Sequence, residues 1–448
     1  MNISSMRLFD RVLGVPACFF LTLCRKMMQL APREEGESPK KVLFVKLAEQ
    51  GSTVLAYRAL KGAVERYGAE NVFFLVFEEN RFILDQLGLI PEGNVIAIRT
   101  GNLMEVIGGM LGALRRVRGE GIDGCVDLEF FARATAVISY LTGARVRVGY
   151  HGFNGEGPYR GDLMTHRLFF NHHLHTTDAF RLLVEALEQP EAALPYFDSD
   201  IRLSFGRMDR KGAVKTRYVL DACDGDYPEF LVSDEDKRAV RELLKRAGGD
   251  EAGTAPVVLL NANCSDLLPL RRWPEENYKE LAYRLLDARP DIVIALTGGP
   301  DEAEGAAALV NRIGHERCFS MAGRTSLREL LVLYCVSEVM VTNDSGPAHF
   351  SSLTPMDCVT LFGPETPGLF GSRSSRAHLL WAGTAFTPCV NALNNREAPA
   401  GDNRCMEKIS VDDVYETVMG VLEKRAPKQK RVRKATAAKK KKSAGAKK

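Results

Sequence analysis

Residues 338–350 read EVMVTNDSGPAHF, and this stretch contains a strand, a tight turn and the start of a helix in direct succession. The apolar run predicts a buried strand, because continuous branched residues are typical of strands covered on both faces. Asn343 to Pro347 break the run, and an apolar helical pattern begins at Ala348. Helix N-termini expose unpaired N–H groups and a partial positive charge, so the turn is a candidate diphosphate site near Gly346.

The polar residues of this turn allow two interpretations. Asp344 stands at the predicted strand tip and could accept hydrogen bonds from the hydroxyl groups of a sugar. Alternatively, Asp344 or Ser345 only caps the helix that follows. The turn taken alone favours capping.

The same alternation of apolar strand and helix extends in both directions from this turn. The expected strands are 41–47, 71–77, 94–98, 124–128 and 145–150 in an N-terminal set, and 257–263, 291–299, 318–321, 338–346 and 358–364 in a C-terminal set. Their unbroken apolar character predicts parallel sheets. We therefore expect an α/β protein with two doubly wound, Rossmann-like domains that face each other across a cleft at the carboxyl ends of the strands.

A polar region rich in Gly and Asp separates the two sets of strands and is predicted to be a linker. The predicted divisions are an apolar and basic N-terminal segment (1–40), an N-terminal domain (41–205), the linker (206–253), a C-terminal domain (254–388), a helical segment (389–423) and a disordered basic tail (424–448).

Composition excludes several classes of protein. The 448 residues are 45% hydrophobic and 26% charged, which rules out a single small module, a collagenous or wholly disordered chain and a polytopic membrane protein. The ten cysteines form no CxxC pair, so we expect reduced thiols. HHLHTTD (172–178) groups three His with an Asp, but we predict structural imidazoles there and no metal site.

The two ends of the chain suggest contact with a membrane surface. Residues 12–24 are apolar and flanked by basic residues, but are too short to span a bilayer. They either lie in a membrane interface or form a helix docked on the chain's own domain. The tail from Lys424 holds 13 Lys or Arg and no acid. Because no aromatic residues interleave these cations, we expect an anionic membrane as partner rather than nucleic acid, with a solvated charge run as the alternative.

Three further loops follow predicted strands. Arg271 lies in the loop after the strand at 257–263, where its planar guanidinium suits phosphate oxygens and Ser265 adds a donor. Glu302 begins a helix after TGGP (297–300) and either holds ribose hydroxyls or only complements the helix dipole. FGPETPG (362–368) is a rigid loop that shapes a pocket wall or is simply a turn.

These motifs together resemble glycosyltransferase family 9, the heptosyltransferases of lipopolysaccharide core assembly. The matching segments, in chain order, are VLFVKLAEQGSTVLAYRAL (42–60), RRWPEENYKEL (271–281), TGGPDE (297–302), GRTSLRELL (323–331), VTNDSGPAHF (341–350) and LFGPETP (361–367). The resemblance implies a GT-B fold and inverting transfer without a metal or other cofactor. It also implies an acceptor in the N-terminal domain and a nucleotide sugar such as ADP-heptose in the C-terminal one.

The resemblance also implies roles for particular residues. It places Arg271 and Lys46 at the diphosphate, together with Gly51 and Ser265 in the donor site, and assigns Glu302 to the ribose and Thr325 to a position near the base. Asp344, Ser345, Gly346 and His349 match the motif that holds the sugar and diphosphate.

The expected catalytic base is missing. The family's usual acidic residue after Gly is Ser52 here, and serine is a poor general base. Glu49 is the nearest carboxylate and the candidate replacement, although it could equally be a surface residue.

The resulting hypothesis is a cytoplasmic glycosyltransferase at the inner face of the inner membrane, with a lipid-linked core oligosaccharide as acceptor. The alternatives are a family member that uses another sugar nucleotide, or a catalytically silent relative that binds a sugar nucleotide or glycan.

Overall fold

The computed structural model describes most of the chain. The described residues are 10–28, 38–153, 155, 157–209, 211–221, 227–264, 268–393 and 401–425. Of the predicted basic tail, only Lys424 and Arg425 fall among them, and these two residues end helix α16 (Val411–Arg425) instead of being disordered. Ser265 and the rest of the tail lie outside the described residues.

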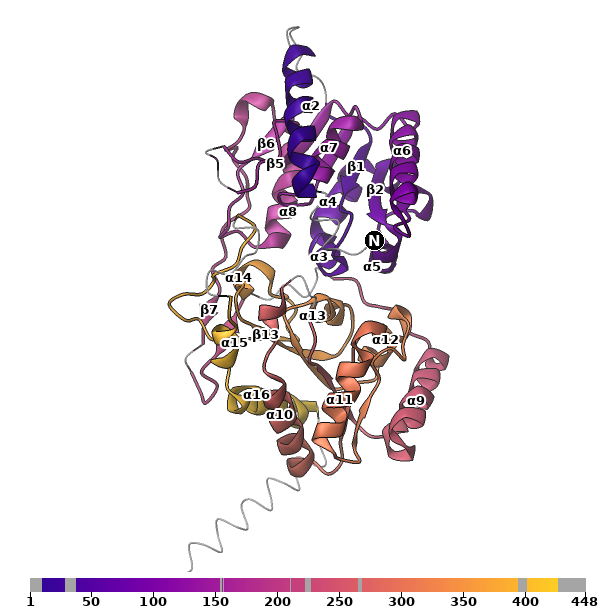
Figure 1. Ribbon diagram of the computed structural model, residues 1–448, viewed down its shortest axis with the longest axis vertical. Helices are drawn as coiled ribbons and strands as arrows, with labels where there is room; N and C mark the ends of the chain where they lie inside the picture. The colour runs from indigo at the N-terminus through magenta and orange to yellow at the C-terminus, as the bar shows by residue number, and fades with distance from the viewer. Residues whose placement is uncertain are drawn as a thin grey trace, which may run out of the picture.

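The N-terminal domain contains a six-stranded parallel sheet in the order β3-β2-β1-β4-β5-β6 (Figure 1). Its strands are β1 (Val42–Val45), β2 (Val72–Phe77), β3 (Val95–Ile98), β4 (Gly124–Asp127), β5 (Val146–Tyr150) and β6 (His166–Leu168). The five strands predicted for this domain are confirmed. The sequence pattern does not reveal β6, because its three residues include His and Arg and form no apolar run.

Helices cover both faces of this sheet. They are α3 (Gln50–Leu55), α4 (Tyr57–Tyr67), α5 (Arg81–Leu87), α6 (Leu103–Gly119), α7 (Arg133–Leu141) and α8 (Thr176–Glu185). Successive strand residues point to opposite faces. Val42 and Phe44 of β1 accordingly share a core with α4 and α8, whereas Leu43 and Val45 share one with α6 and α7.

The C-terminal domain is built on an eight-stranded sheet in the order β11-β10-β9-β12-β13-β14-β8-β7. Its strands are β7 (Arg207–Met208), β8 (Arg217–Val219), β9 (Val257–Asn261), β10 (Val293–Leu296), β11 (Cys318–Ser320), β12 (Val339–Asn343), β13 (Asp357–Phe362) and β14 (Ala377–Trp381). The six strands from β11 to β14 are parallel, and β8 and β7 extend the sheet in antiparallel fashion.

The segment 206–253 is not the simple linker predicted from its composition. It contributes β7 and β8 to the second sheet, and its helix α9 (Asp234–Gly248) packs on the C-terminal domain through Val240 and Leu244. Two short antiparallel edge strands lack the apolar run that identifies buried parallel strands, which is why composition alone misplaces them. The other helices of this domain are α10 (Glu275–Ala288), α11 (Ala303–Ile313), α12 (Leu327–Cys335), α13 (Gly346–Phe350), α14 (Pro367–Phe370), α15 (Arg404–Glu407) and α16.

The apolar N-terminal segment forms helix α2 (Gly14–Met28), which packs on α7 through Cys18. Docking on the chain's own domain, one of the two expectations for this segment, is therefore observed. None of the helices in the described part of the chain combines the length and apolar character that a bilayer span requires. The nine described cysteines are free thiols, as expected.

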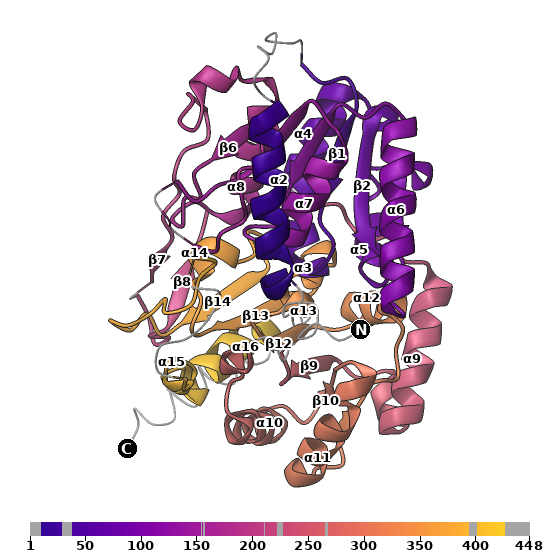
Figure 2. The same ribbon diagram turned by 45° about the horizontal axis from the view of Figure 1, so that its top comes forward.

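The two domains lie one above the other along the long axis of the molecule, with α3 and α13 at their boundary (Figures 1 and 2). Helix α3 follows the carboxyl end of β1, and α13 follows the carboxyl end of β12. The carboxyl ends of both parallel sheets therefore face the boundary, where doubly wound sheets bind their ligands.

Candidate functional site

The turn after β12 is fixed from within by Asn343. Its side-chain Nδ2 donates hydrogen bonds to the carbonyl oxygens of Ala262 and Asn263, both at 3.1 Å, and its Oδ1 accepts one from the backbone N–H of Trp273 at 3.0 Å. Asn343 is fully buried. One amide side chain thus ties the loop after β9 to the turn after β12, so the two predicted phosphate-binding loops lie next to each other.

Arg271 links these loops at their surface. Its Nη1 donates to the carbonyl oxygen of Asp344 at 2.9 Å and lies 3.7 Å from Oδ2 of the same residue. The same nitrogen is 3.5 Å from Oε2 of Glu365, in the loop after β13. The Arg271 side chain is 14% exposed and each carboxylate 4%, so the acids lie behind the guanidinium and hold it in place. The accessible member of this cluster is the cation.

The opposite side of the boundary carries the loop that precedes α3. Lys46 is almost completely buried, with Nζ 3.3 Å from Oε1 of Glu129 and 4.0 Å from Oε2 of Glu49. Ser52 donates its hydroxyl to Oε2 of Glu49 at 3.1 Å. Ser52, which replaces the expected acid, therefore orients the carboxylate of Glu49.

Glu49 has a strained backbone. Its φ of 67° makes it the one non-glycine residue with positive φ in the described part of the chain. Such a conformation costs about 1–3 kcal/mol and persists where the surrounding structure enforces it, often at functional sites. The side chain is 32% exposed, so its carboxylate is accessible as well as oriented.

Gly51 brings the two domains into contact. A Cβ placed on Gly51 would lie 2.9 Å from Cδ2 of His349 and 3.1 Å from Cα of Gly346. Glycine is therefore the residue that lets α3 approach α13 this closely. Through this contact Lys46 and Glu49 of the N-terminal domain share one site with the turn after β12.

His349 is uncharged at neutral pH. Burial and, to a smaller extent, the positive charge of Arg271 lower its pKa to about 4, although Glu49 acts in the opposite direction. Its Nδ1 is buried and has no hydrogen-bond partner among the described residues. His349 therefore acts as a neutral wall of the site next to Gly51.

The remaining predicted donor residues lie on neighbouring turns of the C-terminal domain. Glu302 Oε2 accepts a hydrogen bond from the backbone N–H of Gly299 at 2.7 Å, so this carboxylate caps the short helix Pro300–Glu302. Gly323 donates to the carbonyl of Gly298 at 3.0 Å, which joins the turn before Glu302 to the loop that carries the half-buried Thr325.

The histidine cluster at 172–178 connects the two domains. His175 Nε2 forms a hydrogen bond with the carbonyl oxygen of Gly371 at 2.9 Å, and Asp178 Oδ2 pairs with Nη2 of Arg373 at 2.7 Å. Burial and the nearby Arg373 hold the pKa of His175 well below its usual value. The described residues contain no group of His, Cys, Asp or Glu arranged to hold a metal ion. These imidazole and carboxylate groups serve an interdomain contact.

Three residues of this boundary were not predicted as site residues. Glu365 lies in the loop 362–368, which was predicted to shape a pocket wall or to be simply a turn, Arg373 lies in a loop without a prediction, and Glu129 follows β4. Near Glu129, the fully buried Asp127 pairs with Arg160, and burial raises the pKa of Asp127 to about 6. Glu129 and Glu365 lie just beyond the carboxyl ends of predicted strands, which is a signal in the sequence, whereas Arg373 has none.

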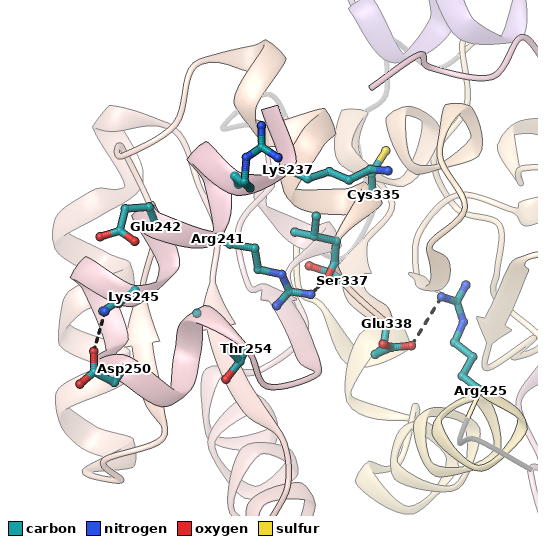
Figure 3. A pocket seen from close by; sticks show the side chains of 13 residues that line it. Lys237, Arg241, Glu242, Lys245, Asp250, Thr254, Cys335, Ser337, Glu338 and Arg425 are labelled. Atoms are coloured by element: carbon teal, nitrogen blue, oxygen red, sulfur yellow. Dashed lines mark hydrogen bonds and ion pairs between the residues drawn. The ribbon is translucent and has the colours of Figure 1, made fainter. Parts of the chain in front are cut away.

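A separate hollow of about 920 Å³ lies at the other end of the C-terminal sheet (Figure 3). It is lined by α9 and by residues that precede β9 and β12, so it is at the amino ends of the strands. Its Lys245 pairs with Asp250 at 3.0 Å, Arg425 with Glu338 at 3.6 Å, and Arg241 donates to two backbone carbonyls. The hollow has no part in the site around Arg271.

Two Rossmann-like domains with the carboxyl ends of their sheets facing each other define the GT-B class of glycosyltransferases. Residues 115–398 match the family described as glycosyltransferase family 9 (heptosyltransferase). The match covers more than half of the chain, and the protein belongs to this family.

Individual relatives align over shorter segments. The chain is 27% identical to lipopolysaccharide heptosyltransferase 2 of Escherichia coli K12 over 157 residues, which are 34% of this chain and 43% of that protein. It is 30% identical to lipopolysaccharide heptosyltransferase 2 of Salmonella typhimurium over 115 residues, 25% of this chain and 32% of the relative. The alignments thus span less than half the length of these relatives.

Solved structures support the fold over 85–86% of the chain. The structure of E. coli ADP-heptose LPS heptosyltransferase II superposes with a TM-score of 0.61 at 19% identity, covering 86% of this chain and 100% of that one. An E. coli heptosyltransferase solved with ADP gives a TM-score of 0.52 at 16% identity, with coverage of 85% and 99%. The predicted GT-B fold is confirmed.

Proposed function

We propose that this protein transfers heptose from ADP-heptose to a lipopolysaccharide core acceptor. The observation that supports this most strongly is the contact between Gly51 and α13, because it places Lys46 and Glu49 opposite Arg271 and Asp344. A cation from each domain and an oriented carboxylate at this boundary suit a diphosphate leaving group and a hydroxyl nucleophile. The family's heptosyltransferases supply the sugar and acceptor in this proposal.

The proposed reaction is a single displacement with inversion. The acceptor hydroxyl attacks the anomeric carbon of heptose, its proton passes to Glu49, and the bond to the ADP oxygen breaks. Electrostatic stabilisation of the departing diphosphate comes from Arg271 and Lys46, and requires no metal in this scheme. Arg271 stands beside Asp344 and Glu365, and Lys46 beside Glu49 and Glu129, so each cation is partly balanced and the scheme uses both.

The other donor contacts follow the positions of the family motifs. Asp344, whose carboxylate is 4% exposed, positions Arg271 toward the donor, and Ser345 with the amide of Gly346 contacts the diphosphate. Helix α13 has five residues, so the guanidinium of Arg271 contributes more to anion binding than the helix dipole does. Glu302 and Thr325 lie on the adjoining turns, where the ribose and base of ADP would extend.

A second candidate function is a relative that binds a sugar nucleotide but transfers nothing. Ser52 motivates this alternative, because it occupies the position of the family's usual acid. The hydrogen bond from Ser52 to Glu49 favours the active enzyme, since it orients a replacement carboxylate. A third possibility is transfer from a different sugar nucleotide through the same diphosphate contacts.

A transfer assay distinguishes these functions. Purified protein is incubated with ADP-heptose and a heptose-deficient core acceptor, and the mass of the product is measured. We expect one added heptose, with kcat lowered about 100-fold or more by Glu49→Gln, as expected for loss of a general base. Arg271→Ala and Asp344→Ala should also slow transfer.

The matched control for these variants is Arg284→Ala, which removes a half-buried arginine of α10 paired with Asp412. It should leave transfer unchanged. If the parent transfers heptose and none of the three site variants transfers it more slowly, the assigned roles are contradicted. Binding of ADP-heptose without any product would favour the silent relative.

The location at the inner face of the inner membrane is part of the same proposal. The 13 basic residues from Lys424 onward suit an anionic surface. Deletion of residues 426–448 should weaken binding to anionic vesicles at low salt and have little effect at high salt, because salt screens such contacts. Equal binding with and without these residues would remove the tail from the proposal.

A further inference from the structure

Helix α2 exposes an apolar face to solvent. Phe19 is 66% exposed, Phe20 63%, Leu23 50% and Met27 65%. At 100° per residue these four side chains fall on one side of the helix, opposite Cys18, which is fully buried against α7. Four large apolar residues on one helix face form a contiguous exposed patch, which is unusual on a soluble monomer.

The exposed side of α2 is fixed by polar contacts on its inner side. Arg25 pairs with Asp162 at 2.7 Å, and Thr22 accepts a hydrogen bond from the backbone N–H of Asp162 at 2.8 Å. Just before the helix, Asp10 accepts hydrogen bonds from the first backbone N–H groups of α7, at 2.9 Å from Arg133. These contacts leave the apolar side facing outward.

Helix α6 has a second apolar stripe. Leu103 is 45% exposed, Met104 76%, Ile107 46% and Leu111 50%. The spacing of three or four residues places these side chains on one side of the helix. The buried residues Ala113 and Val117 lie on a different side of α6, against the sheet.

Both stripes belong to the same face of the domain. Helices α6 and α7 share the core on one side of the sheet, and α2 forms an outer layer on α7. Figure 2 shows α2, α7 and α6 together at the front of the domain. Helix α6 starts after the carboxyl end of β3, and Gly14 of α2 adjoins Arg133 at the start of α7. The stripes therefore begin at the end of the domain that borders the interdomain boundary.

The charges along the stripes are mainly basic, with Glu105 in the first turn of α6 as the exception. Residues 11–28 contain no Asp or Glu, and Arg11 and Lys26 are exposed near the ends of α2. Residues 106–119 also contain no acid, and Arg115, an exposed residue, continues the α6 stripe one turn beyond Leu111. Aromatic and aliphatic side chains with flanking cations are the composition of helices that lie in the headgroup region of anionic membranes.

We propose that α2 and α6 form a two-helix docking surface for an anionic phospholipid bilayer. The apolar stripes enter the boundary between headgroups and acyl chains, and the flanking arginine and lysine side chains contact lipid phosphates. This orientation sets the rim of the interdomain site at the membrane. For the acceptor, the inference rests on the proposed function: a core oligosaccharide could then reach Glu49 while its lipid stays in the bilayer.

Vesicle flotation of the full chain tests this surface. One triple variant carries Phe19→Gln, Phe20→Gln and Leu23→Gln, and the other carries Met104→Gln, Ile107→Gln and Leu111→Gln. With vesicles of phosphatidylethanolamine and phosphatidylglycerol, we expect each to lower the ratio of bound to free protein about tenfold or more, because each removes three inserting side chains. The loss should persist at high salt. Vesicles of phosphatidylcholine alone should bind the parent more weakly.

The control replaces two equally exposed apolar residues away from this face, Phe205→Gln with Leu231→Gln, and should bind as the parent does. Circular dichroism and thermal melting establish that all variants fold. Parent-like flotation of both triple variants overturns the proposal. A second result would also overturn it: the parent is a dimer, and the triple variants dissociate this dimer but float with the vesicles as the parent does. The face formed by α2 and α6 would then be an interface between two copies of the chain.

The transfer assay separates this inference from the proposed function. Loss of flotation in the triple variants supports the docking surface even if no heptose is transferred. If transfer occurs, the triple variants should act normally on a deacylated, soluble acceptor and poorly on the acceptor in vesicles. Equal impairment on both acceptors contradicts a docking role.

Discussion

Replacement of Gly51 by alanine tests whether the close approach of the two domains is needed for activity. The added Cβ would lie 2.9 Å from Cδ2 of His349 and 3.1 Å from Cα of Gly346. Carbon atoms in favourable contact are about 3.5–4.0 Å apart, so α3 and α13 must separate by roughly 0.5–1 Å. Neither neighbour can easily yield, because His349 is buried and the Gly346 atom is backbone.

The expected cost of this overpacking is about 1–3 kcal/mol. It opposes the arrangement in which Glu49 and Lys46 face the C-terminal domain, so kcat/KM for heptose transfer should fall by about 5- to 100-fold. Binding of ADP should change less, since Arg271 and Asp344 belong to one domain. Steady-state kinetics and calorimetric titration with ADP measure the two quantities.

Gly62→Ala is the matched control. Gly62 lies in α4, and a Cβ there meets no atom within 4 Å. This change should raise the free energy of unfolding by about 0.5–1 kcal/mol, because alanine is the better helix former, and should leave kcat/KM unchanged. Wild-type kinetics for Gly51→Ala, or equal losses for both variants, would refute the reasoning.

Three further predictions concern charged and titrating groups at the boundary. Arg271→Ala should lower the free energy of unfolding by about 3–5 kcal/mol, because it leaves buried carboxylates without their cation. The double variant with Glu365→Gln should recover part of the lost stability. Unfolding in urea measures the stability of both variants. The pKa of His349 is lowered to about 4 in the folded state, so the free energy of unfolding should decrease by up to about 3 kcal/mol as the pH falls from about 6.5 towards 4. The variant His349→Gln should flatten this part of the curve of stability against pH. Arg373→Met should destabilise the interdomain contact by about 3–5 kcal/mol, and further replacement of Asp178 by Asn should restore stability; an undiminished melting temperature in Arg373→Met would show that the pair contributes nothing.

The sequence predicts those parts of the fold that depend on local apolar patterning. Ten strands are recognisable because each is largely buried and consists mainly of apolar residues. Four strands are not predicted from the sequence. Strands β6, β7 and β8 are only two or three residues long, and β14 contains His378, which pairs with Asp357. An edge strand is stabilised by hydrogen bonds to the neighbouring strand of the sheet. When this neighbour is distant in sequence, the residues around the edge strand show no local pattern that predicts it.

The sequence motifs predict which loops form the candidate site, but they do not predict the contacts between these loops. The motifs around Arg271 and Asp344 identify each loop, but their mutual position depends on the buried amide of Asn343. Likewise, Gly51 and His349 are almost 300 residues apart, and only the packed domains show why the glycine lacks room for a Cβ. Long-range contacts of this kind have no sequence period that could reveal them.

The most direct test of the account measures ADP binding by isothermal titration calorimetry. If Arg271 holds the diphosphate, Arg271→Ala should weaken ADP binding about tenfold or more, as expected for loss of a charge-assisted contact, whereas Arg284→Ala should not. Adenosine, which lacks the phosphates, should bind both variants as weakly as it binds the parent. ADP affinity that is unchanged in a folded Arg271→Ala protein would contradict the central claim that the loops after β9 and β12 form the donor site.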